Sequence, residues 1–275
     1  MAIAGSVHDG APAWSPDGTH IVFSGENGDQ TDLYIMDAAG TDRRQVTSTP
    51  AEENAPAFSP DGRTIAFETN RDGNFEIYLV DINGRDPRRL TTSPADDRAP
   101  SWSPDGQRLV FLSDRDHPKR FDVYTMRADG SDIVRLTTDQ TAWSPAFSPD
   151  GATIALQVGG DIELIPARGG ALKRLTSPAA NGMSPAWAPD GQRLAFVTTR
   201  NGKPELYTMT PDGSNQQPLV SMASGAAIDP RWSPDGSRIA FVYVADGTPG
   251  AGDAAQDYAI YSVELSTSKV TRISP

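Results

Sequence analysis

The sequence predicts an all-β fold, a six-bladed β-propeller of four-stranded antiparallel blades, on three observations. A turn of the type Ser-Pro-Asp-Gly recurs at Ser15, Ser59, Ser103, Ser148 and Ser233, with Ala188 replacing serine in one further copy. The copies start 44, 44, 45, 40 and 45 residues apart, and a fixed period of this length indicates a repeat architecture. Runs of β-branched and aromatic residues flank each turn, as strands do. Such four-stranded units bury their faces by packing radially around an axis.

The first two strands of each repeat form a hairpin around this turn. The first strand ends in an aromatic residue, which is Trp14, Phe58, Trp102, Phe147, Trp187 or Trp232. In the turn, proline presets φ, aspartate bonds to its own backbone and glycine accepts a positive φ. The second strand ends in Phe23, Phe67, Phe111, Leu156, Phe196 or Phe241.

A third and a fourth strand complete each repeat. Examples of the third strand are residues 76–80 and 122–126, and the fourth strand follows a second turn, as at residues 88–91 and 134–137. A linear stack is the alternative to a ring, but it needs polar capping repeats, and the first and last copies here keep their core aromatics. We therefore expect a closed ring with almost no helix.

The repeats divide the chain into an N-terminal segment, residues 1–8, and a single propeller, residues 9–275. The blades are expected at about 9–49, 50–94, 95–139, 140–178, 179–222 and 223–275. Residues 3–7 either add a short strand or stay outside the sheets. Since the repeats begin on an inner strand and end on an outer one, no strand is expected to be exchanged between blades one and six. Face-to-face packing would then close the ring.

The repeat itself resembles a known family. The order Pro-x-Trp-Ser-Pro-Asp-Gly, Ile-Ala-Phe, Arg-Asp-Gly-x-x-Glu-Ile-Tyr and Leu-Thr is similar to the WD40-like repeat of the TolB propeller domain, over about residues 9–273. Related propellers precede the hydrolase domain of dipeptidyl and prolyl peptidases. The resemblance implies a protein partner of the cell envelope and a periplasmic location, whereas a native start at Met1 would imply the cytoplasm.

Composition narrows the classes of partner. The formal net charge is −12, which disfavours nucleic acid because duplex binding requires cations that replace counterions. No run approaches the roughly 18 apolar residues of a membrane helix, so no membrane insertion is expected. The absence of cysteine removes disulfides and thiolate sites. We expect a monomer that binds a protein or peptide.

The candidate binding residues precede or begin the inner strands, where they should surround the mouth of the channel on the face with variable loops. They are His8, Asp9, Glu52, Glu53, Asp96, Asp97, Arg98, Trp143 and Met183, with Asp229 and Arg231 further along the sixth inner strand. One half of this ring is acidic and the other apolar, which suits a cation or a basic, partly apolar peptide. The alternative is that the carboxylates are solvated linker residues.

Two groups of charged residues are expected to have structural roles. Asp229 and Arg231 are expected to form an ion pair in the channel. The acids that precede the third strands recur around the ring, together with arginines a few residues earlier, and are expected to form ion pairs between blades. They are Asp32, Glu76, Asp122, Asp161 and Glu205, with Arg71, Arg115 and Arg200.

No catalytic, metal or cofactor residues are assigned. The nucleophile elbow Gly-x-Ser-x-Gly is absent, and His8, His20 and His117 fall at unrelated repeat positions. The leading hypothesis is a non-catalytic binding scaffold. The alternatives are an accessory propeller of a larger hydrolase, such as a prolyl or dipeptidyl peptidase, and a stand-alone hydrolase or lyase that acts on carbohydrates.

Overall fold

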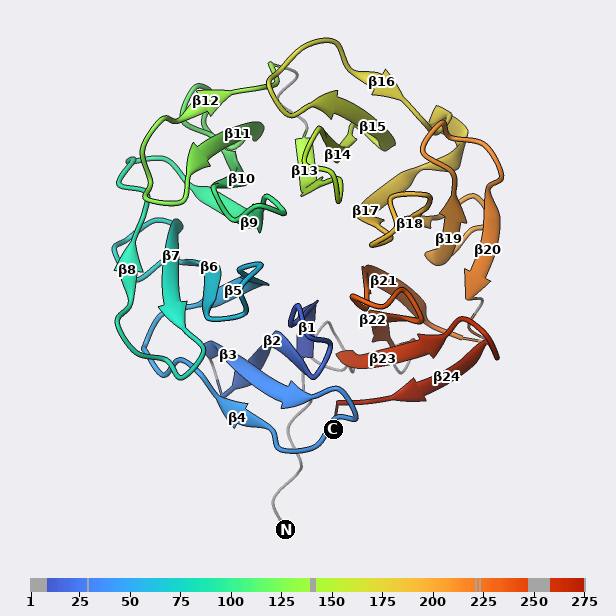
Figure 1. Cartoon of the computed structure of the whole chain (residues 1–275), viewed down its shortest axis with the longest axis horizontal. Coiled ribbons are helices and arrows are strands. Elements are labelled where there is room, and N and C mark those ends of the chain that lie inside the picture. The colour runs from blue at the N-terminus through green and yellow to red at the C-terminus, as the bar shows by residue number, and fades with distance from the viewer. Residues whose placement is uncertain are drawn as a thin grey trace.

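The computed structural model describes residues 9–28, 30–138, 142–220, 222, 224–246 and 258–274. In this part of the chain, six four-stranded antiparallel sheets surround a central axis (Figure 1). This confirms the all-β, six-bladed propeller predicted from the repeats. Within the described ranges, helical structure is limited to a short 3-10 turn at Pro178–Ala180, and no helix has the length and apolar character to cross a bilayer. His8 lies outside the described residues.

The first three blades contain twelve strands in chain order, each blade running outward from the axis. Blade one contains β1 (Asp9–Trp14), β2 (His20–Asn27), β3 (Gln30–Asp37) and β4 (Arg44–Gln45). Blade two contains β5 (Glu53–Phe58), β6 (Thr64–Thr69), β7 (Glu76–Asp81) and β8 (Arg88–Arg89). Blade three contains β9 (Asp97–Trp102), β10 (Arg108–Ser113), β11 (Asp122–Arg127) and β12 (Val134–Arg135).

The last three blades repeat this order. Blade four contains β13 (Ala142–Phe147), β14 (Thr153–Val158), β15 (Asp161–Pro166) and β16 (Lys173–Arg174). Blade five contains β17 (Gly182–Trp187), β18 (Leu194–Thr198), β19 (Glu205–Met209) and β20 (Gln217–Val220). Blade six contains β21 (Ala226–Trp232), β22 (Arg238–Val244), β23 (Tyr258–Glu264) and β24 (Lys269–Arg272).

Side-chain and backbone hydrogen bonds hold the repeated turn between first and second strands. In blade one, the Ser15 hydroxyl donates to Asp17 Oδ1 at 2.6 Å, and the Thr19 amide donates to the same oxygen at 3.0 Å. The Gly18 amide donates to the Ser15 carbonyl at 2.9 Å, and Gly18 has a φ of 70°. Glycine adopts this left-handed conformation without the steric cost that other residues incur, which explains the fixed sequence of the turn.

Every inner strand contains a β-bulge beside its proline. In blade two, for example, the pairing between β5 and β6 shifts between Asn54 and Ala57. The residue before the proline has a φ between 47° and 50° in all six blades. It is Ala11, Ala55, Ala99, Ser144, Ser184 or Asp229. Proline is tolerated here because the inner strand is an edge strand, whose missing amide breaks no ladder bond on the channel side.

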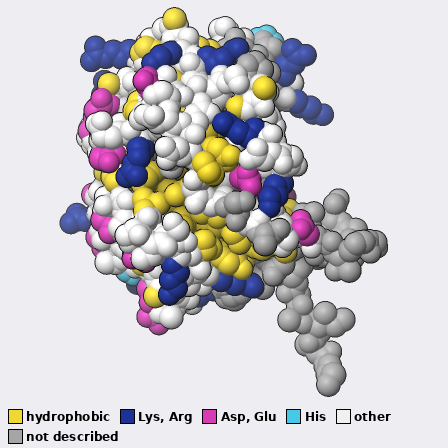
Figure 2. Space-filling model, turned by 90° about the vertical axis from the view of Figure 1, so that its right-hand side faces the viewer, with side chains coloured by type: hydrophobic (Ala, Val, Ile, Leu, Met, Phe, Trp, Pro, Cys, Tyr) yellow, Lys and Arg dark blue, Asp and Glu magenta, His cyan; other side chains and the backbone are white. Residues whose placement is uncertain are grey.

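The hydrophobic core lies between neighbouring blades. The phenylalanines of the second strands, Phe23, Phe67, Phe111, Phe196 and Phe241, lie within these strands and not at their ends, and they are fully buried. A typical cluster joins Ala66, Ile77 and Leu79 of blade two to Leu109 and Phe111 of blade three. Figure 2 shows hydrophobic side chains gathered in a band on the side of the ring that carries blades five and six. Each blade therefore depends on its neighbours to bury its faces.

The ring closes by packing of blade one against blade six. Neither four-stranded sheet includes a strand from the other blade, in agreement with the arrangement expected from the repeat order. The Trp14 indole donates to the Arg231 carbonyl at 3.2 Å. Trp14 also belongs to a buried cluster that includes Ala240, Ile260 and Ile273 of blade six. Closure of the described ring thus rests on side-chain packing.

Candidate partner-binding face

Strand direction sorts the loops onto two faces. Because successive strands are antiparallel, the turns between first and second strands lie at the same end of the blades as the turns between third and fourth strands. This end is called the regular face. The loops between second and third strands, and the linkers between blades, lie at the opposite end, called the variable face. The first residues of the inner strands, including Asp9, Glu53 and Asp97, lie toward the variable face.

Three of the predicted binding residues are fully buried in ion pairs. Asp9, Glu53 and Asp97 each have a relative exposure of 0%. The pairs join Arg43 Nη1 to Asp9 Oδ2 at 3.1 Å, Arg71 Nη2 to Glu53 Oε1 at 3.0 Å, and Arg115 Nη2 to Asp97 Oδ2 at 2.9 Å. The three carboxylates therefore have no surface with which to touch a partner, and their charges are balanced within their own blades.

Aromatic rings support the arginines of these pairs. The guanidinium carbons of Arg71 and Arg115 lie 4.7 Å and 4.9 Å from the ring centroids of Tyr78 and Tyr124. In blade one, Arg43 reaches the equivalent place from the segment before β4 and lies 4.3 Å from the centroid of Tyr34. Contacts at this distance add cation–π attraction to the ion pair.

Burial raises the pKa values of the carboxyl groups of Asp9, Glu53 and Asp97, because removal from water disfavours the charged form. Hydrogen bonds and the neighbouring arginine charges act in the opposite direction. In Asp97, for example, the Ser113 hydrogen bond and the Arg115 charge lower the pKa. The ion pairs thus offset the cost of burial, which is what a structural role requires.

A second cluster joins blades two and three near the same face. Arg98 Nη2 lies 3.3 Å from Asp96 Oδ2, and Arg98 Nη1 lies 3.5 Å from Glu68 Oε1. The guanidinium carbon lies 3.6 Å from the ring centroid of Phe75. Burial raises the pKa of Glu68, while the Ala99 amide and the Arg98 charge lower it. Asp96 and Arg98 stay half-buried, so they keep some surface for contact.

The acidic residues that begin the third strands form ion pairs with other partners than those predicted from the sequence. Glu76 Oε1 lies 2.7 Å from Arg89 Nη2, and Asp122 Oδ2 lies 2.6 Å from Arg135 Nη2. Both arginines belong to the fourth strand of the same blade, and the prediction of ion pairs between blades is wrong for these acids. The physical reason is the ladder: β7 pairs with β8, and this places the arginine beside the acid.

The apolar half of the variable face contains the most exposed large hydrophobic side chain in the described part of the chain. Trp143 in β13 is 48% exposed. Its ring centroid lies 5.4 Å from that of Phe121, which precedes β11 in blade three. Met183 is half-buried and packs against the core between blades five and six. Of the predicted residues, Trp143 and the exposed Glu52 are therefore the most accessible.

Asp229 and Arg231 line the central channel, as their positions on the inner strand of blade six predicted. The channel has a volume of about 470 Å³ and is lined by small residues, prolines and the terminal aromatic residues of all six inner strands. The Ser184 hydroxyl donates to Asp229 Oδ1 at 3.0 Å, and Arg231 Nη1 donates to the Pro230 carbonyl at 2.8 Å.

The expected ion pair between Asp229 and Arg231 is not formed. Among the described residues, no carboxylate oxygen lies within 4.0 Å of the Arg231 guanidinium. The left-handed backbone of Asp229, with φ at 49°, turns its side chain to the neighbouring blade instead. Burial lowers the pKa of Arg231, while the charge of Asp229 raises it. The Arg231 guanidinium thus belongs to the channel lining and has no carboxylate partner among the described residues.

The described ranges contain no group of three or more histidine, cysteine, aspartate or glutamate residues placed to hold a metal ion. His20 belongs to β2 of blade one, whereas His117 lies between β10 and β11 of blade three. The accessible side chains at the variable face are thus Trp143 of blade four, the exposed Glu52 before β5 and the half-buried Asp96 before β9.

Comparison with known proteins agrees with this architecture. A curated relative, the Tol-Pal system protein TolB of Syntrophus aciditrophicus strain SB, is 46% identical over 39 residues, which are 14% of this chain and 9% of the relative. The match thus spans less than a tenth of that relative's length. The crystal structure of TolB from Acinetobacter baumannii has 26% identity and a TM-score of 0.71, and the match covers 85% of this chain and 58% of that one.

An enzyme also shares the fold. The tricorn protease structure has a TM-score of 0.72 and 21% identity, and the match covers 98% of this chain and 26% of that one. At this identity the likeness shows the fold alone. The family model described as the TolB beta propeller domain matches residues 3–73, 40–158 and 138–275. With its six repeats, its closed ring and matches to that model along nearly its whole length, the chain belongs to the TolB beta-propeller family.

Proposed function

We propose that the protein is a non-catalytic scaffold that binds a protein or peptide partner on its variable face. The observation that carries this proposal is the 48% exposed side chain of Trp143, which rests on Phe121 of the neighbouring blade. A large aromatic held in place by a second ring loses little conformational freedom on binding, and tryptophan is enriched among the residues that dominate binding energy.

Charge defines the partner further. Glu52 is exposed and Asp96 half-exposed on the same face, and the chain as a whole carries a net charge of −12. A basic, partly apolar protein segment complements this surface, whereas the phosphates of nucleic acid are repelled. Because a curated relative is a Tol-Pal system protein, we propose a partner in the cell envelope, a periplasmic location and a monomeric scaffold.

The test begins with a displayed peptide library selected against the wild-type protein. The affinities of the selected peptides are then measured for Trp143→Ala and Glu52→Lys. Because Glu53 is buried, its exposed neighbour Glu52 is the informative acid. We expect Trp143→Ala to weaken binding about tenfold or more and Glu52→Lys to weaken it less.

A control is Gln192→Ala, which removes an exposed side chain from a turn on the regular face of blade five. This variant should bind the selected peptides as the wild type does. If Trp143→Ala retained full affinity for every selected peptide while remaining folded, the variable face would not be the binding face.

A second candidate function is that of an accessory propeller in a larger hydrolase, such as a prolyl or dipeptidyl peptidase. The observation in its favour is that tricorn protease contains this fold within about a quarter of its chain. The intact mass of the native protein decides between the two functions. A mass near 29.4 kDa contradicts the hydrolase function, and a much larger mass with peptidase activity supports it.

A further inference from the structure

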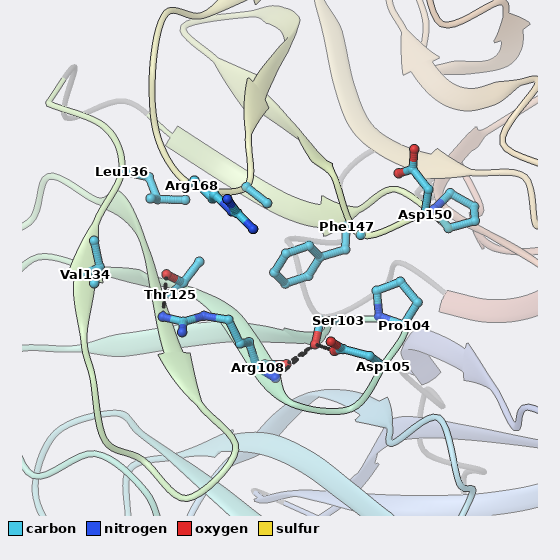
Figure 3. A pocket seen from close by; sticks show the side chains of 13 residues that line it. Ser103, Pro104, Asp105, Arg108, Thr125, Val134, Leu136, Phe147, Asp150 and Arg168 are labelled. Carbon is cyan, nitrogen blue, oxygen red and sulfur yellow. Dashed lines mark hydrogen bonds between the residues drawn. The ribbon is translucent and has the colours of Figure 1, made fainter.

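A cavity of about 740 Å³ opens between blades three and four on the regular face, away from the proposed partner-binding face. Its cationic and apolar wall consists of Arg108, Val134 and Leu136 of blade three and Phe147 and Arg168 of blade four. These five residues define the blade 3/4 cavity. In the view of Figure 3, both guanidinium groups lie on the side of Phe147 that faces Val134 and Leu136.

The cavity exists because the second turn of blade four stands away from blade three. In four other blades, a Cβ atom added to the glycine of this turn would lie 1.9–2.7 Å from a carbonyl oxygen of the preceding blade; these glycines are Gly40, Gly84, Gly130 and Gly213. At Gly169, the nearest atom to such a Cβ is Leu136 Cδ2, at 3.7 Å. Leu136 consequently stays half-buried, whereas its counterparts Leu90 and Leu175 are buried.

A smaller aromatic residue widens the same space. At two other junctions, Arg193 and Arg238 lie 4.8 Å from the indole centroids of Trp232 and Trp14. Arg108 occupies the equivalent repeat position, but the ring of the next blade is Phe147. Arg108 turns to Asp132, with Nη1 at 2.9 Å from Oδ2, and to the Thr125 hydroxyl, 3.4 Å from Nη2. Space that an indole fills elsewhere is therefore open here.

The second cation of the cavity is available for a ligand. Arg168 is exposed, and no described residue forms a hydrogen bond or an ion pair with its guanidinium. The other blades place Ala39, Asn83, Asp129, Asp212 and Ser266 at this point of the second turn. Blade four alone therefore carries a positive charge there, in a chain whose net charge is −12.

Two aspartates also line the cavity, but they are bonded to their own turns. Asp105 Oδ1 accepts from the Ser103 hydroxyl at 2.6 Å, and Asp150 Oδ1 accepts from the Ser148 hydroxyl at 2.5 Å. These hydrogen bonds lower the pKa values of both carboxyl groups, so they remain charged. An acidic ligand group is therefore directed to the arginine side, while the aspartates can accept N–H donors at the other side.

Apolar surface continues from the cavity onto the outer edge of blade three. Ile133 and Val134 are 40% and 41% exposed, and with Trp143 they are the exposed large hydrophobic residues of the described chain. Val134 begins β12, which is the outer strand of its blade. A ligand that uses this surface as well as the cavity must be longer than the cavity, as a polypeptide is.

We propose that the blade 3/4 cavity binds the carboxyl end of a polypeptide whose last residues are apolar. The terminal carboxylate would bond to the Arg168 guanidinium, with Arg108 beside it, since carboxylates and guanidinium groups form charge-assisted hydrogen bonds. The last side chain would pack on Phe147 and Leu136, and the preceding residue on Val134. A volume of about 740 Å³ falls in the usual range for ligand pockets.

The test measures the fluorescence anisotropy of an N-terminally labelled hexapeptide, Gly-Ser-Gly-Ser-Leu-Leu, as the free acid and as the amide. We expect the acid to bind the wild type and the amide to bind about tenfold more weakly or worse. Arg168→Asp, which introduces the acid found in two other blades, and Phe147→Trp, which fills the cavity as tryptophan does elsewhere, should each weaken binding of the acid about tenfold or more.

Two control variants test whether binding depends on this cavity. Arg63→Ala removes an exposed arginine beside a turn of the same face and should leave binding unchanged, and so should Trp143→Ala on the variable face. No binding of the acid at millimolar concentration, or equal binding of acid and amide, would overturn the proposal. So would displacement of the peptide by 4-methylpentanoate at equal affinity, which would make the ligand a small acid. If Phe147→Trp does not fold, Arg168→Asp at an exposed turn decides.

Discussion

The inner strands of blades one to three and of blades four to six begin with different kinds of residue. In blades one to three, the first position of the inner strand holds a buried carboxylate, Asp9, Glu53 or Asp97, paired with an arginine. In blades four to six the equivalent position, five residues before the aromatic end of the strand, holds Ala142, Gly182 or Ala227. At Gly182, an added Cβ would lie 3.0 Å from Ile162 and 3.1 Å from Thr176, so a side chain there would require these neighbours to shift.

The difference shows that an acidic residue in the sequence does not always place a charge on the protein surface. Blades one to three look acidic in sequence, but each of the three buried carboxylates lies within about 3 Å of a guanidinium nitrogen. Blades four to six look neutral, and they contribute the exposed Trp143. The features left to define a partner are thus Trp143, with Glu52 and Asp96 at the rim of the other half.

The largest expected effect comes from placing a carboxylate on the inner strand of blade four, whose loop after the second strand has no arginine like Arg71 or Arg115. Ala142 is fully buried, and Ala142→Asp would bury an unpaired charge. We expect the free energy of unfolding to fall by about 3–5 kcal/mol, measured by urea denaturation. Ala142→Asn has nearly the same volume without the charge and serves as the control. An aspartate variant as stable as the asparagine variant would contradict the comparison.

The reverse change removes a carboxylate from the paired half. Asp97→Ala would leave Arg115, whose side chain is 22% exposed, without its partner. A loss of about 2–3 kcal/mol is expected, below the range for fully buried pairs because water reaches the arginine. The double variant with Arg115→Ala should lose less than the sum of the two single losses. Additive losses would show that the pair contributes nothing beyond its separate parts.

A pH experiment sharpens the comparison at the junction of blades two and three. Burial raises the pKa of Glu68, with smaller contributions in the same direction from Asp96 and Glu52. The folded state therefore holds the proton more tightly than the unfolded state does. The contribution of Glu68 to stability is largest below its ordinary pKa of 4.5 and is lost as the pH rises through the raised value.

The variant Glu68→Gln cannot ionise, so the stability of the wild type relative to this variant should fall between pH 4 and pH 7. Urea midpoints at the two values measure this change. A difference that stays constant, or that moves in favour of the wild type as the pH rises, would show that burial does not raise the pKa of Glu68.

The smallest effects are expected at the turns of the regular face, which are alike in both halves. Hydrogen bonds from neighbouring hydroxyl and amide groups lower the pKa of Asp17 in blade one and of Asp235 in blade six to about 2. Both carboxylates are therefore stabilising above about pH 4, and this contribution fades as the pH falls toward 2.

Asp17→Asn and Asp235→Asn should accordingly cause small and equal losses of thermal stability at pH 7. The losses should diminish when melting is followed at pH values approaching 2. Unequal losses would show that the two halves differ at the regular face as well, and would weaken the contrast between the halves at the variable face.

The repeats predicted the fold because each turn and each aromatic strand end recurs six times, so an error in one copy is corrected by the others. The site was harder to predict. Asp9 takes its arginine from residue 43, whereas Glu53 and Asp97 take theirs from the loop after the second strand, at Arg71 and Arg115. Such partners are set by three-dimensional packing, and the sequence could not show that the carboxylates are buried.

The blade 3/4 cavity was missed although the sequence contains a signal for it. When the repeats are aligned, Phe147 stands where four copies have tryptophan, and Arg168 is the only cation at its place in the second turn. These two departures from the repeat become informative once the structure shows that both residues lie at the junction of blades three and four. The expected ion pair of Asp229 and Arg231 is not formed, because the left-handed backbone at Asp229 turns its side chain toward Ser184 of blade five. The sequence contains no signal for this backbone conformation.

The most direct test of the binding function is photo-crosslinking from the variable face. A benzoylphenylalanine residue replaces Trp143, and a matched variant carries it at Asp235 on the regular face of blade six. Each protein is irradiated with the envelope fraction of its native cells. A discrete adduct from position 143 and none from position 235 is the predicted result. The same adducts from both positions, or no discrete adduct from position 143, would contradict a binding scaffold that acts through its variable face.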